Sequence, residues 1–466
     1  MLILFPLIYI TTFTFALKGI LKGQRAEILL FLIFGLPIYI TTLSLTYSLG
    51  YSGFVGFFQA FKELLVLSLL GIQVWTLKKP IRFHIIDYAI IAYFAYTLLY
   101  ALLPIGEQGL VNRLLAFKGL SFFPLVYFCA RLIDLHELYI SKYFHYILYL
   151  ALAAALVVLF EYLTYQHFQT LTGYADYYYY FFNFEPTGSY GLTYTFEAEG
   201  GLKRFASFFA SPLEHAAATL LALAVIAALY TRPNNHFKPD FWGYVILLAT
   251  QVSIYLAISR SALLSYFLMI YVYALLTRKK YILHFIHACA VAAVLYFLFL
   301  LNDKDIQEFV ITTLNFTNPS SVGHVIEWIE GISSMIRKPL GLGLGTSGRI
   351  GGSLGDQTGG ENQFIIIGVQ AGVIAFSLYL FIYLAFIKTA WKWFYHLKGK
   401  EKQICLALLL MKVGFLIPFF TSELESSPYI SYTTWFFSGL FISVIMNQQQ
   451  QSIPENSKIM SSLRDF

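Results

Sequence analysis

The feature that most constrains this chain is a series of long apolar stretches that carry almost no charge. Residues 241–277 contain a single charged residue, Arg260. As one helix they would extend for about 55 Å, at a rise of about 1.5 Å per residue. The hydrocarbon core of a bilayer is only about 30 Å thick and is crossed by about 20 residues. The stretch therefore predicts two membrane-crossing helices with a break at Arg260.

The rest of the sequence repeats this pattern. Of the 466 residues, 58% are hydrophobic and 12% are charged, about half the charged fraction of a soluble domain. The apolar segments fall near 2–17, 27–47, 60–77, 85–103, 114–132, 143–163, 208–230, 241–258, 261–277, 281–301, 364–387, 403–420 and 430–446. They predict an all-α polytopic membrane protein with about 12–13 transmembrane helices. The first segment lacks a basic start and a clear cleavage site, so we interpret it as a retained span rather than a signal peptide.

Basic residues indicate how these spans are oriented. If thirteen spans alternate, the basic loops all fall on one side, which the positive-inside rule makes cytoplasmic. These loops contain Lys18, Lys22, Arg25, Lys78, Lys79, Arg82, Arg232, Lys238, Arg278, Lys279, Lys280, Lys388, Lys392, Lys398, Lys400 and Lys402. The net charge of +6 is thus explained by orientation, because basic residues scattered over loops form no stripe that would bind nucleic acid.

The same arrangement divides the chain into regions. It places two long loops outside the cytoplasm, one of them containing short helices. The regions are N-terminal spans with an aromatic outer loop at 164–207 (1–207), central spans (208–301), a large outer loop (302–363), C-terminal spans (364–446) and a cytoplasmic tail (447–466).

The segment GLGTSG at 343–348 has the glycine spacing of a dinucleotide-binding fingerprint. That fingerprint needs a strand before it and a helix after it. Here the preceding SVGHVIEWIEGISSMIRKP has apolar residues at helical spacing, and the following RIGGSLGDQTGG is typical of a loop. We therefore reject an NAD site. The glycines instead predict a turn that brings backbone N–H groups close to a ligand or a neighbouring helix, with a flexible loop as the alternative. They are Gly341, Gly343, Gly345 and Gly348.

Few charged residues lie on the outer side, so those few are the candidates for chemistry. Arg204 precedes a span, and Arg260 stands at the break between two spans. A planar guanidinium holds phosphate oxygens with two parallel hydrogen bonds, so two arginines on one face suit a diphosphate. The alternative is that each arginine anchors its helix by reaching to the lipid headgroups.

Glu361 and His324 are the candidates for a catalytic base, since a carboxylate or an imidazole can accept the proton of a hydroxyl nucleophile. The alternatives are structural. A lone histidine on a helix commonly belongs to the packing, and Glu361 would cap the helix that opens with NQFIII, helped by the helix dipole. Glu214 and His215, just inside the span after Arg204, are weaker candidates.

The stretch YADYYYYFFNFEP in the first long outer loop is unusually aromatic. Aromatic rings often form a belt at the membrane surface. They also offer flat, amphipathic surfaces for sugar rings. On that interpretation the glycan-stacking residues are Tyr174, Tyr177, Tyr178 and Tyr179.

Four landmarks occur in order along the chain: RFASFFASPLEHAA, the SRSALL break, HVIEWIEGISSMIRKPLGLGLGTSG, and GENQFIIIGVQAGVIAF. This ordered set, over roughly residues 200–380, resembles the O-antigen ligase and polymerase superfamily of bacterial envelope glycosyltransferases. The resemblance implies a GT-C-like membrane fold, usually with twelve spans, and dropping the first segment here leaves twelve. It also implies an enzyme of the bacterial inner membrane that acts on its periplasmic side in lipopolysaccharide or other surface polysaccharide synthesis.

The resemblance further implies substrates and residue roles. The donor is a glycan on undecaprenyl diphosphate, and the acceptor is lipid A core, another lipid-linked glycan or sometimes a protein. No cofactor, metal or nucleotide sugar is expected. Arg204 and Arg260 match the arginines that hold the donor diphosphate. Glu361 and Asn362 stand where many ligases have His-Asn, so Asn362 joins the predicted substrate loop and the departure favours a repeat-unit polymerase. His324 stands where an arginine is common.

A transporter or flippase of the same lipid-linked glycans is the alternative function. Transporters typically show internal repeats, broken helices in mid-bilayer and buried charges. Here the ionisable residues of interest lie at the outer boundary, and a long outer loop suits an enzyme better than a carrier. The sequence therefore favours glycosyl transfer, either as polymerase or as ligase.

Overall fold

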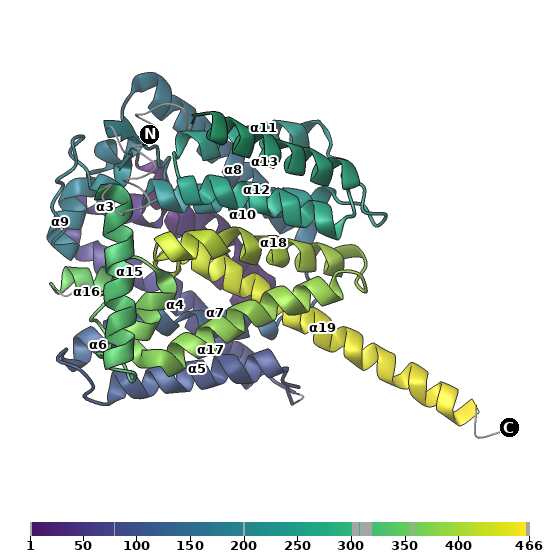
Figure 1. Ribbon diagram of the computed structural model, residues 1–466. Helices are drawn as coiled ribbons and strands as arrows, with labels where there is room; N and C mark the ends of the chain where they lie inside the picture. Colours follow the sequence, from purple (N-terminus) through teal and green to yellow (C-terminus); the bar gives the residue numbers. More distant parts are fainter. Residues whose placement is uncertain are drawn as a thin grey trace.

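The computed structural model describes residues 2–78, 80–198, 201–300, 307, 319–355 and 358–462. These residues are almost entirely helical, and their one sheet is a short antiparallel pair in which Glu197 faces Lys203. The long helices lie side by side in one bundle (Figure 1). The helices and strands are α1 (Leu4–Leu21), η1 (Arg25–Glu27), α2 (Ile28–Leu30), η2 (Phe31–Gly35), η3 (Leu36–Ile38), α3 (Tyr39–Ser48), α4 (Ser52–Trp75), α5 (Ile85–Leu102), α6 (Leu110–Ser121), α7 (Phe123–Arg131), α8 (Ile140–Thr164), η4 (Phe168–Thr172), α9 (Tyr174–Phe182), η5 (Tyr194–Phe196), β1 (Glu197–Ala198), β2 (Leu202–Lys203), α10 (Pro212–Tyr230), α11 (Phe241–Leu256), α12 (Arg260–Leu276), α13 (Lys280–Leu300), α15 (Pro319–Arg337), α16 (Gly348–Ser353), α17 (Gln363–Trp393), α18 (Gly399–Thr421), η7 (Leu424–Ser426) and α19 (Pro428–Ser462).

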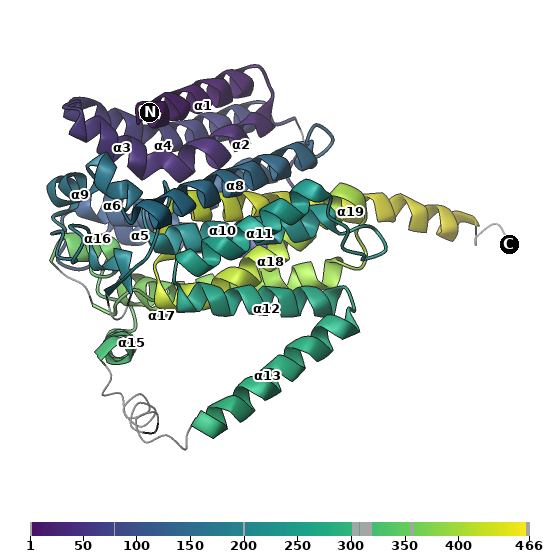
Figure 2. The same ribbon diagram turned by 90° about the horizontal axis from the view of Figure 1, so that it is seen from above.

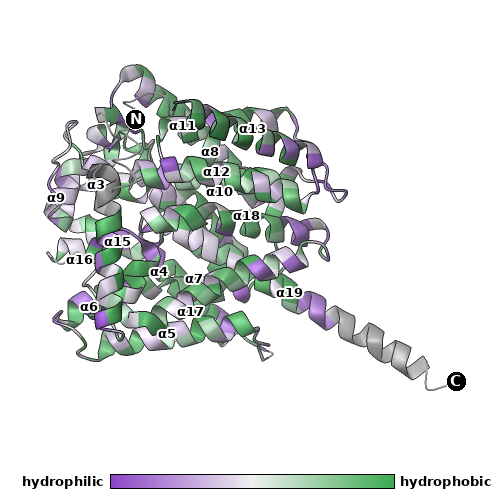
Figure 3. Cartoon of the chain, viewed as in Figure 1, coloured by the Kyte–Doolittle hydropathy of each residue, from purple (hydrophilic) through white to green (hydrophobic). Residues whose placement is uncertain are grey.

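The bundle has the helix lengths and composition of a polytopic membrane protein, as the sequence predicts. Within the described ranges, ten helices are long and apolar enough to cross a bilayer, and α6 with α7 forms an eleventh candidate that is bent by 44°. The helices on either side of the predicted break at Arg260, α11 and α12, are apolar but shorter. All the predicted apolar segments are thus helical. Figure 3 shows apolar residues along the helix bodies and hydrophilic residues mainly at the two ends of the bundle.

Contacts between loops show that basic residues gather at one end of the bundle, which we call the basic end. Arg25 donates a hydrogen bond to the Thr76 hydroxyl (2.6 Å), and Lys402 donates to the side-chain oxygen of Asn235 (2.7 Å). Each bond joins loops that the alternating arrangement places on the same side. We call the opposite end, where residues 165–198, 201–211, 338–355, 358–362 and 422–427 lie, the outer end.

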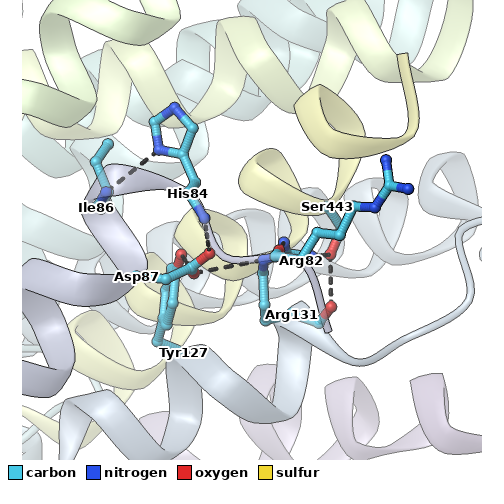
Figure 4. A network of polar contacts seen from close by, with 7 residues as sticks. All are labelled: Arg82, His84, Ile86, Asp87, Tyr127, Arg131 and Ser443. Carbon is cyan, nitrogen blue, oxygen red and sulfur yellow. Dashed lines mark hydrogen bonds and ion pairs between the residues drawn. The ribbon is translucent and has the colours of Figure 1, made fainter. Parts of the chain in front are cut away.

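A buried network fastens three helices near the basic end (Figure 4). The Asp87 carboxylate of α5 accepts hydrogen bonds from the His84 N–H (2.6 Å) and from the Tyr127 hydroxyl of α7 (2.5 Å). It also lies 3.4 Å from Nε of Arg131, whose carbonyl accepts a hydrogen bond from the Ser443 hydroxyl of α19 (2.7 Å). Since a buried charge is costly unless it is paired and hydrogen-bonded, this network holds α5, α7 and α19 in one register.

Helix α17 is broken at Gly372, and the glycine-rich segment docks onto the break. Gly372 has φ 78° and ψ 179°, a backbone conformation essentially restricted to glycine. The carbonyls freed by the break find new donors, because the Leu342 N–H bonds to Val369 (2.7 Å) and the Gly343 N–H to Gln370 (3.0 Å). The segment that follows α15 is thereby fixed against α17.

Two of the predicted loop glycines explain how the segment fits there. Gly341 and Gly343 have φ of 84° and 106°. A Cβ on Gly341 would lie 2.6 Å from the Gly372 nitrogen, and one on Gly343 would collide with the Ile105 carbonyl. The expected close approach to a neighbouring helix is therefore what the structure shows at these two positions. A flexible loop without contacts does not fit these two glycines.

The described part of the large outer loop includes α15, a helix of 19 residues, and the short helix α16. Helix α15 lies across the outer end, while α13 stands apart from the bundle (Figures 1 and 2). Helix α16 follows the glycine-rich segment, and residues 301–306 and 308–318 of the predicted loop lie outside the described residues. Helix α19 continues through residues 447–462 of the predicted tail and projects beyond the bundle (Figure 1).

The two ends of the bundle are expected to face opposite sides of the membrane. In a Cys289→Ser background the remaining cysteines, Cys129 and Cys405, are buried. Tyr194→Cys at the outer end should then react with a membrane-impermeant maleimide in sealed, right-side-out vesicles. Lys398→Cys at the basic end should react only after permeabilisation. Labelling of both positions from the same side would contradict the assigned orientation.

The break in α17 is expected to require glycine. Gly372→Ala should destabilise the protein by about 1–3 kcal/mol through backbone strain, and the added Cβ would press on the Pro339 carbonyl. The control is Gly71→Ala in α4, where the added Cβ meets no described atom within 4 Å. That change should stabilise the helix by about 0.5–1 kcal/mol. Thermal unfolding in detergent compares the two variants, and an equal melting temperature would show that the break tolerates a side chain.

Candidate functional site

A cavity of about 190 Å³ lies at the outer end of the bundle, where segments from distant parts of the sequence meet. Its walls come from α9 and the loop after it, the first residues of α10 and α16, the residues before α17, and the turn between α18 and α19. It is lined by Tyr174, Tyr178, Phe184, Thr193, Thr195, Ser211, Leu213, Glu214, Gly348, Arg349, Gly360, Glu361, Ser422, Glu423, Leu424, Ser426 and Ser427. An arginine and three glutamates thus share one cavity beside apolar spans.

Arg349 and Glu423 make the closest polar contact in this cavity. The backbone N–H of Arg349 donates a hydrogen bond to Oε2 of Glu423 at 2.6 Å. The preceding Gly348 has φ 70°, and a Cβ there would lie 2.8 Å from the same oxygen. The absent side chain of Gly348, which is predicted to belong to the substrate loop, therefore makes room for a cavity carboxylate.

The guanidinium of Arg349 faces the cavity. Its central carbon lies 5.6 Å from the centre of the Tyr178 ring, within the range of a cation–π interaction. Glu214 and Glu423 are both close enough to act on its charge. Within the described residues the guanidinium makes no hydrogen bond and no ion pair. Its N–H donors are consequently available to a ligand.

Burial controls the protonation of Glu423. It raises the pKa of this carboxyl group to about 7, and the negative charge of Glu361 acts in the same direction. The hydrogen bond from Arg349 and the positive charge of Arg349 oppose the shift. A carboxyl group that titrates near neutral pH is suited to accept a proton and to release it again.

The turn that carries Glu423 is held in place by Glu425. The Glu425 carboxylate accepts hydrogen bonds from the Tyr379 hydroxyl of α17 (2.5 Å) and from Nε1 of Trp435 in α19 (2.8 Å). Its own N–H donates to the side chain of Gln363 (3.2 Å). Helices α17 and α19 therefore hold the turn that carries Glu423.

Glu214 reaches the cavity because it lies in the first turn of α10. Ser211 caps this helix by accepting a hydrogen bond from the Glu214 N–H (3.2 Å), and the Ala210 N–H donates to the Glu214 carboxylate (3.2 Å). Ser, Thr, Asn and Asp are the preferred residues at this position of a helix. The cap directs the carboxylate outward from the bundle.

Arg204, Arg260 and Glu361 converge beside the same cavity. Burial lowers the pKa of Arg204, the charge of Glu361 opposes this shift, and the like charge of Arg260 adds to it. Both side chains therefore lie near enough to act on the Arg204 guanidinium. Nε of Arg204 also donates to the Ala257 carbonyl (3.2 Å), just before the α11–α12 break that carries Arg260. Glu361 lines the cavity as well, and so connects the two arginines to it.

Glu161, at the outer end of α8, holds the segment that carries Arg204. Its buried carboxylate accepts hydrogen bonds from the Phe168 N–H (2.8 Å) and the Ser207 N–H (2.7 Å). These two residues flank the aromatic outer loop. One carboxylate therefore joins both ends of the loop to α8, a role that the sequence analysis did not foresee.

The helix cap expected of Glu361 belongs to its neighbour. Oδ1 of Asn362 accepts hydrogen bonds from the N–H groups of Phe364 (3.0 Å) and Ile365 (3.2 Å) at the start of α17. Asn362, predicted as a substrate-loop residue, is thus buried as a structural cap. Glu361 is exposed toward the cavity.

Three of the four tyrosines predicted to stack on a glycan are buried in the fold. Tyr174, Tyr177 and Tyr178 are at most 3% exposed, and the rings of Tyr174 and Tyr178 stack on each other at 4.1 Å. Tyr174 and Tyr178 still line the cavity, whereas Tyr179 is 55% exposed on the surface. An open platform of four rings does not fit this burial. The hydroxyl of Tyr178 has no hydrogen-bond partner among the described residues.

The remaining predicted residues differ in position. Gly345 donates its N–H to the Gln370 side chain (2.8 Å) and so belongs to the docking of the loop on α17. His324 lies on α15, and its side chain is outside the described residues.

Sequence reasoning missed Arg349 and Glu423 and ranked Glu214 low. Arg349 directly follows the glycine motif, and Glu423 lies in TSELESS between two apolar segments. Each is a charged residue in an outer loop, which was the criterion that selected Arg204 and Arg260. Applied to every outer loop, that criterion would have found them.

Comparison with known proteins adds no family. No protein-family model matches this chain, and no curated protein sequence matches it.

Asn362→Ala is expected to lower stability by about 1 kcal/mol, because it removes the cap of α17. Asn362→Asp and Asn362→Ser keep a side-chain oxygen and should retain near-normal stability. Chemical or thermal unfolding of the three variants measures the difference. If the variants that preserve the cap lost function at full stability, Asn362 would act on substrate and not only as a cap.

Proposed function

We propose that this protein is a membrane glycosyltransferase that acts at the outer end of the bundle. Its donor is a glycan linked to a polyprenyl diphosphate such as undecaprenyl diphosphate, and its acceptor is a hydroxyl of another glycan, of lipid A core or of a protein. The proposal includes a GT-C-like fold and a location in a bacterial inner membrane with the active site on the periplasmic side. It rests on the resemblance of the four ordered landmarks and on the arrangement of charges described above.

The observation that carries the proposal is the convergence of Arg204 and Arg260 beside a polar cavity at the end of apolar spans. A lipid diphosphate has its charge at the membrane surface and its chain in the bilayer, so its receptor needs cations at that depth. Helix α12 also begins at Arg260. The positive ends of helix dipoles favour an anion there.

The reaction that this arrangement suits is a single displacement at the anomeric carbon. The acceptor oxygen forms a bond to that carbon while the bond from carbon to the diphosphate oxygen breaks. The leaving lipid diphosphate gains negative charge, which fixed guanidinium groups at Arg204 and Arg260 stabilise. The sequence-based candidates for the base that takes the hydroxyl proton are Glu361 and His324.

We further propose that the acceptor is another lipid-linked glycan, which makes the protein a polymerase of surface polysaccharide repeat units. The support is the Glu361-Asn362 pair, which stands where His-Asn is common in ligases. Asn362, not Glu361, caps α17, and the side chain of Glu361 is exposed.

Arg204→Ala and Arg260→Ala are each expected to lower kcat by about 10²–10³-fold, the effect typical of removing one group that stabilises developing charge. Arg337→Ala, at the exposed end of α15, is the control and should retain activity. The assay uses purified protein in liposomes with a polyprenyl-diphosphate-linked glycan, and product chains are resolved by gel or mass spectrometry. Full activity of both variants would show that these arginines do not hold the diphosphate.

The same liposomes separate the alternative functions. Chains that lengthen on the lipid carrier indicate a polymerase, and transfer to lipid A core indicates a ligase. Movement of the lipid-linked glycan across the bilayer without any new glycosidic bond would identify a flippase and would overturn the proposed transferase.

A further inference from the structure

We call the part of the cavity lined by Arg349 and Glu423 the Arg349–Glu423 half. It has no role in the function proposed above, although its polar groups can form hydrogen bonds with a ligand. The guanidinium of Arg349 uses none of its donors within the described residues, and the buried Tyr178 hydroxyl has no partner there. Leaving such a buried hydroxyl unsatisfied costs about 1–3 kcal/mol. A ligand that forms hydrogen bonds with both groups would remove that cost.

The balance of charges in this half of the cavity differs from that around Arg204 and Arg260. Arg204 lies within electrostatic reach of a second cation, Arg260, and of the carboxylate of Glu361. By contrast, two carboxylates, Glu214 and Glu423, face the one guanidinium of Arg349. When both carboxylates are ionised, an anionic ligand would meet net repulsion there, whereas an uncharged polar ligand would find donors and acceptors together.

The chemistry of such a ligand is that of a sugar ring without an acidic group. Its hydroxyls donate to carboxylates and accept from a guanidinium. The lining adds Tyr174 and Tyr178, together with Ser422 and Ser426, whose hydroxyls donate to backbone carbonyls and can still accept hydrogen bonds. Aromatic side chains beside a few polar groups are common in sites that bind small molecules.

We propose that this half of the cavity is the acceptor subsite, that it takes an uncharged sugar, and that Glu423 accepts the proton of the attacking hydroxyl. The inference rests on the proposed glycosyl transfer. It deepens that function by naming the class of acceptor and by assigning the base to a residue outside the sequence-based candidates.

The geometry favours Glu423 over Glu361 as the base. Oε2 of Glu423 is held by the Arg349 N–H at 2.6 Å, and Oε1 makes no hydrogen bond with any described residue. One oxygen is thus fixed while the other is available to a hydroxyl. Glu361 instead lies within electrostatic reach of Arg204, where its charge balances the cations that hold the diphosphate.

The proposed step balances in atoms and electrons. The acceptor O–H bond breaks as its proton passes to the Glu423 carboxylate, and the oxygen forms the new bond to the anomeric carbon. The bond between that carbon and the diphosphate oxygen breaks, and its electron pair leaves with the lipid diphosphate. Glu423 then releases the proton to water, which its raised pKa permits near neutral pH.

The first test is the Glu423→Gln variant in the liposome assay. The amide oxygen of glutamine can still accept the Arg349 N–H, so folding is preserved. With the base removed, kcat should fall about 100-fold or more while the KM for the lipid-linked donor stays within about twofold of wild type. Glu330→Gln on the exposed face of α15 is the matched control and should be fully active. Activity of Glu423→Gln within threefold of the control would overturn the assignment of the base.

The pH profile separates a base from a structural carboxylate. The active form of Glu423 is ionised, and its pKa is about 7. Wild-type kcat should therefore rise about tenfold per pH unit below pH 7 and level off above it. The residual activity of Glu423→Gln should lack this step. If the step persisted in the variant, another group would be the base.

The class of acceptor is tested with two glycans that differ only in the terminal sugar, a neutral hexose or its uronic acid. The neutral acceptor should have a kcat/KM at least about tenfold higher.

Arg349→Met should raise the KM for the acceptor about tenfold or more and leave the KM for the donor unchanged, a split that a general loss of structure would not produce. Equal use of both acceptors would overturn the subsite. An inactive wild type with either acceptor would instead count against glycosyl transfer itself.

Discussion

The outer end of this protein depends on how backbone hydrogen bonds are satisfied at a broken membrane helix. Without water in the hydrocarbon region, irregular backbone is tolerated only where protein groups replace the lost partners. At Gly372 the freed carbonyls of α17 are taken by N–H groups of Leu342 and Gly343. That docking fixes the loop against the bundle and places Arg349 opposite Glu423, so the cavity is a consequence of the break.

The need to satisfy buried polar groups also explains why single buried carboxylates hold whole segments in place. Glu161 accepts two N–H groups that flank the aromatic loop, and Glu425 joins the α18–α19 turn to α17 and α19. Each carboxylate is fully supplied with donors, which is the condition for burying charge at acceptable cost. They leave Arg204, Glu361 and Glu423 in fixed places at the mouth of an otherwise apolar bundle.

The sequence predicted the helices well because their signal is local. The lengths of apolar runs and the distribution of lysine and arginine depend only on neighbours along the chain, and the break at Arg260 follows from length alone. The same reasoning selected Arg204, Arg260 and Glu361, which the structure brings together. The cap of α17, which was the structural alternative for Glu361, belongs to Asn362, and three of the four tyrosines predicted to stack on a glycan pack inside the fold. Both differences concern which way a side chain points.

By itself, then, the sequence determined a helical membrane protein with basic residues at one end, because hydrophobic length and charge act residue by residue. Only the tertiary structure decided that Arg349 meets Glu423 and that Tyr174 and Tyr178 belong to the core. Those contacts join residues far apart in the chain, and they depend on the break at Gly372 and on caps and carboxylates that orient neighbouring segments. Such contacts cannot be predicted from the periodicity of the sequence, because they form only when distant helix ends pack side by side.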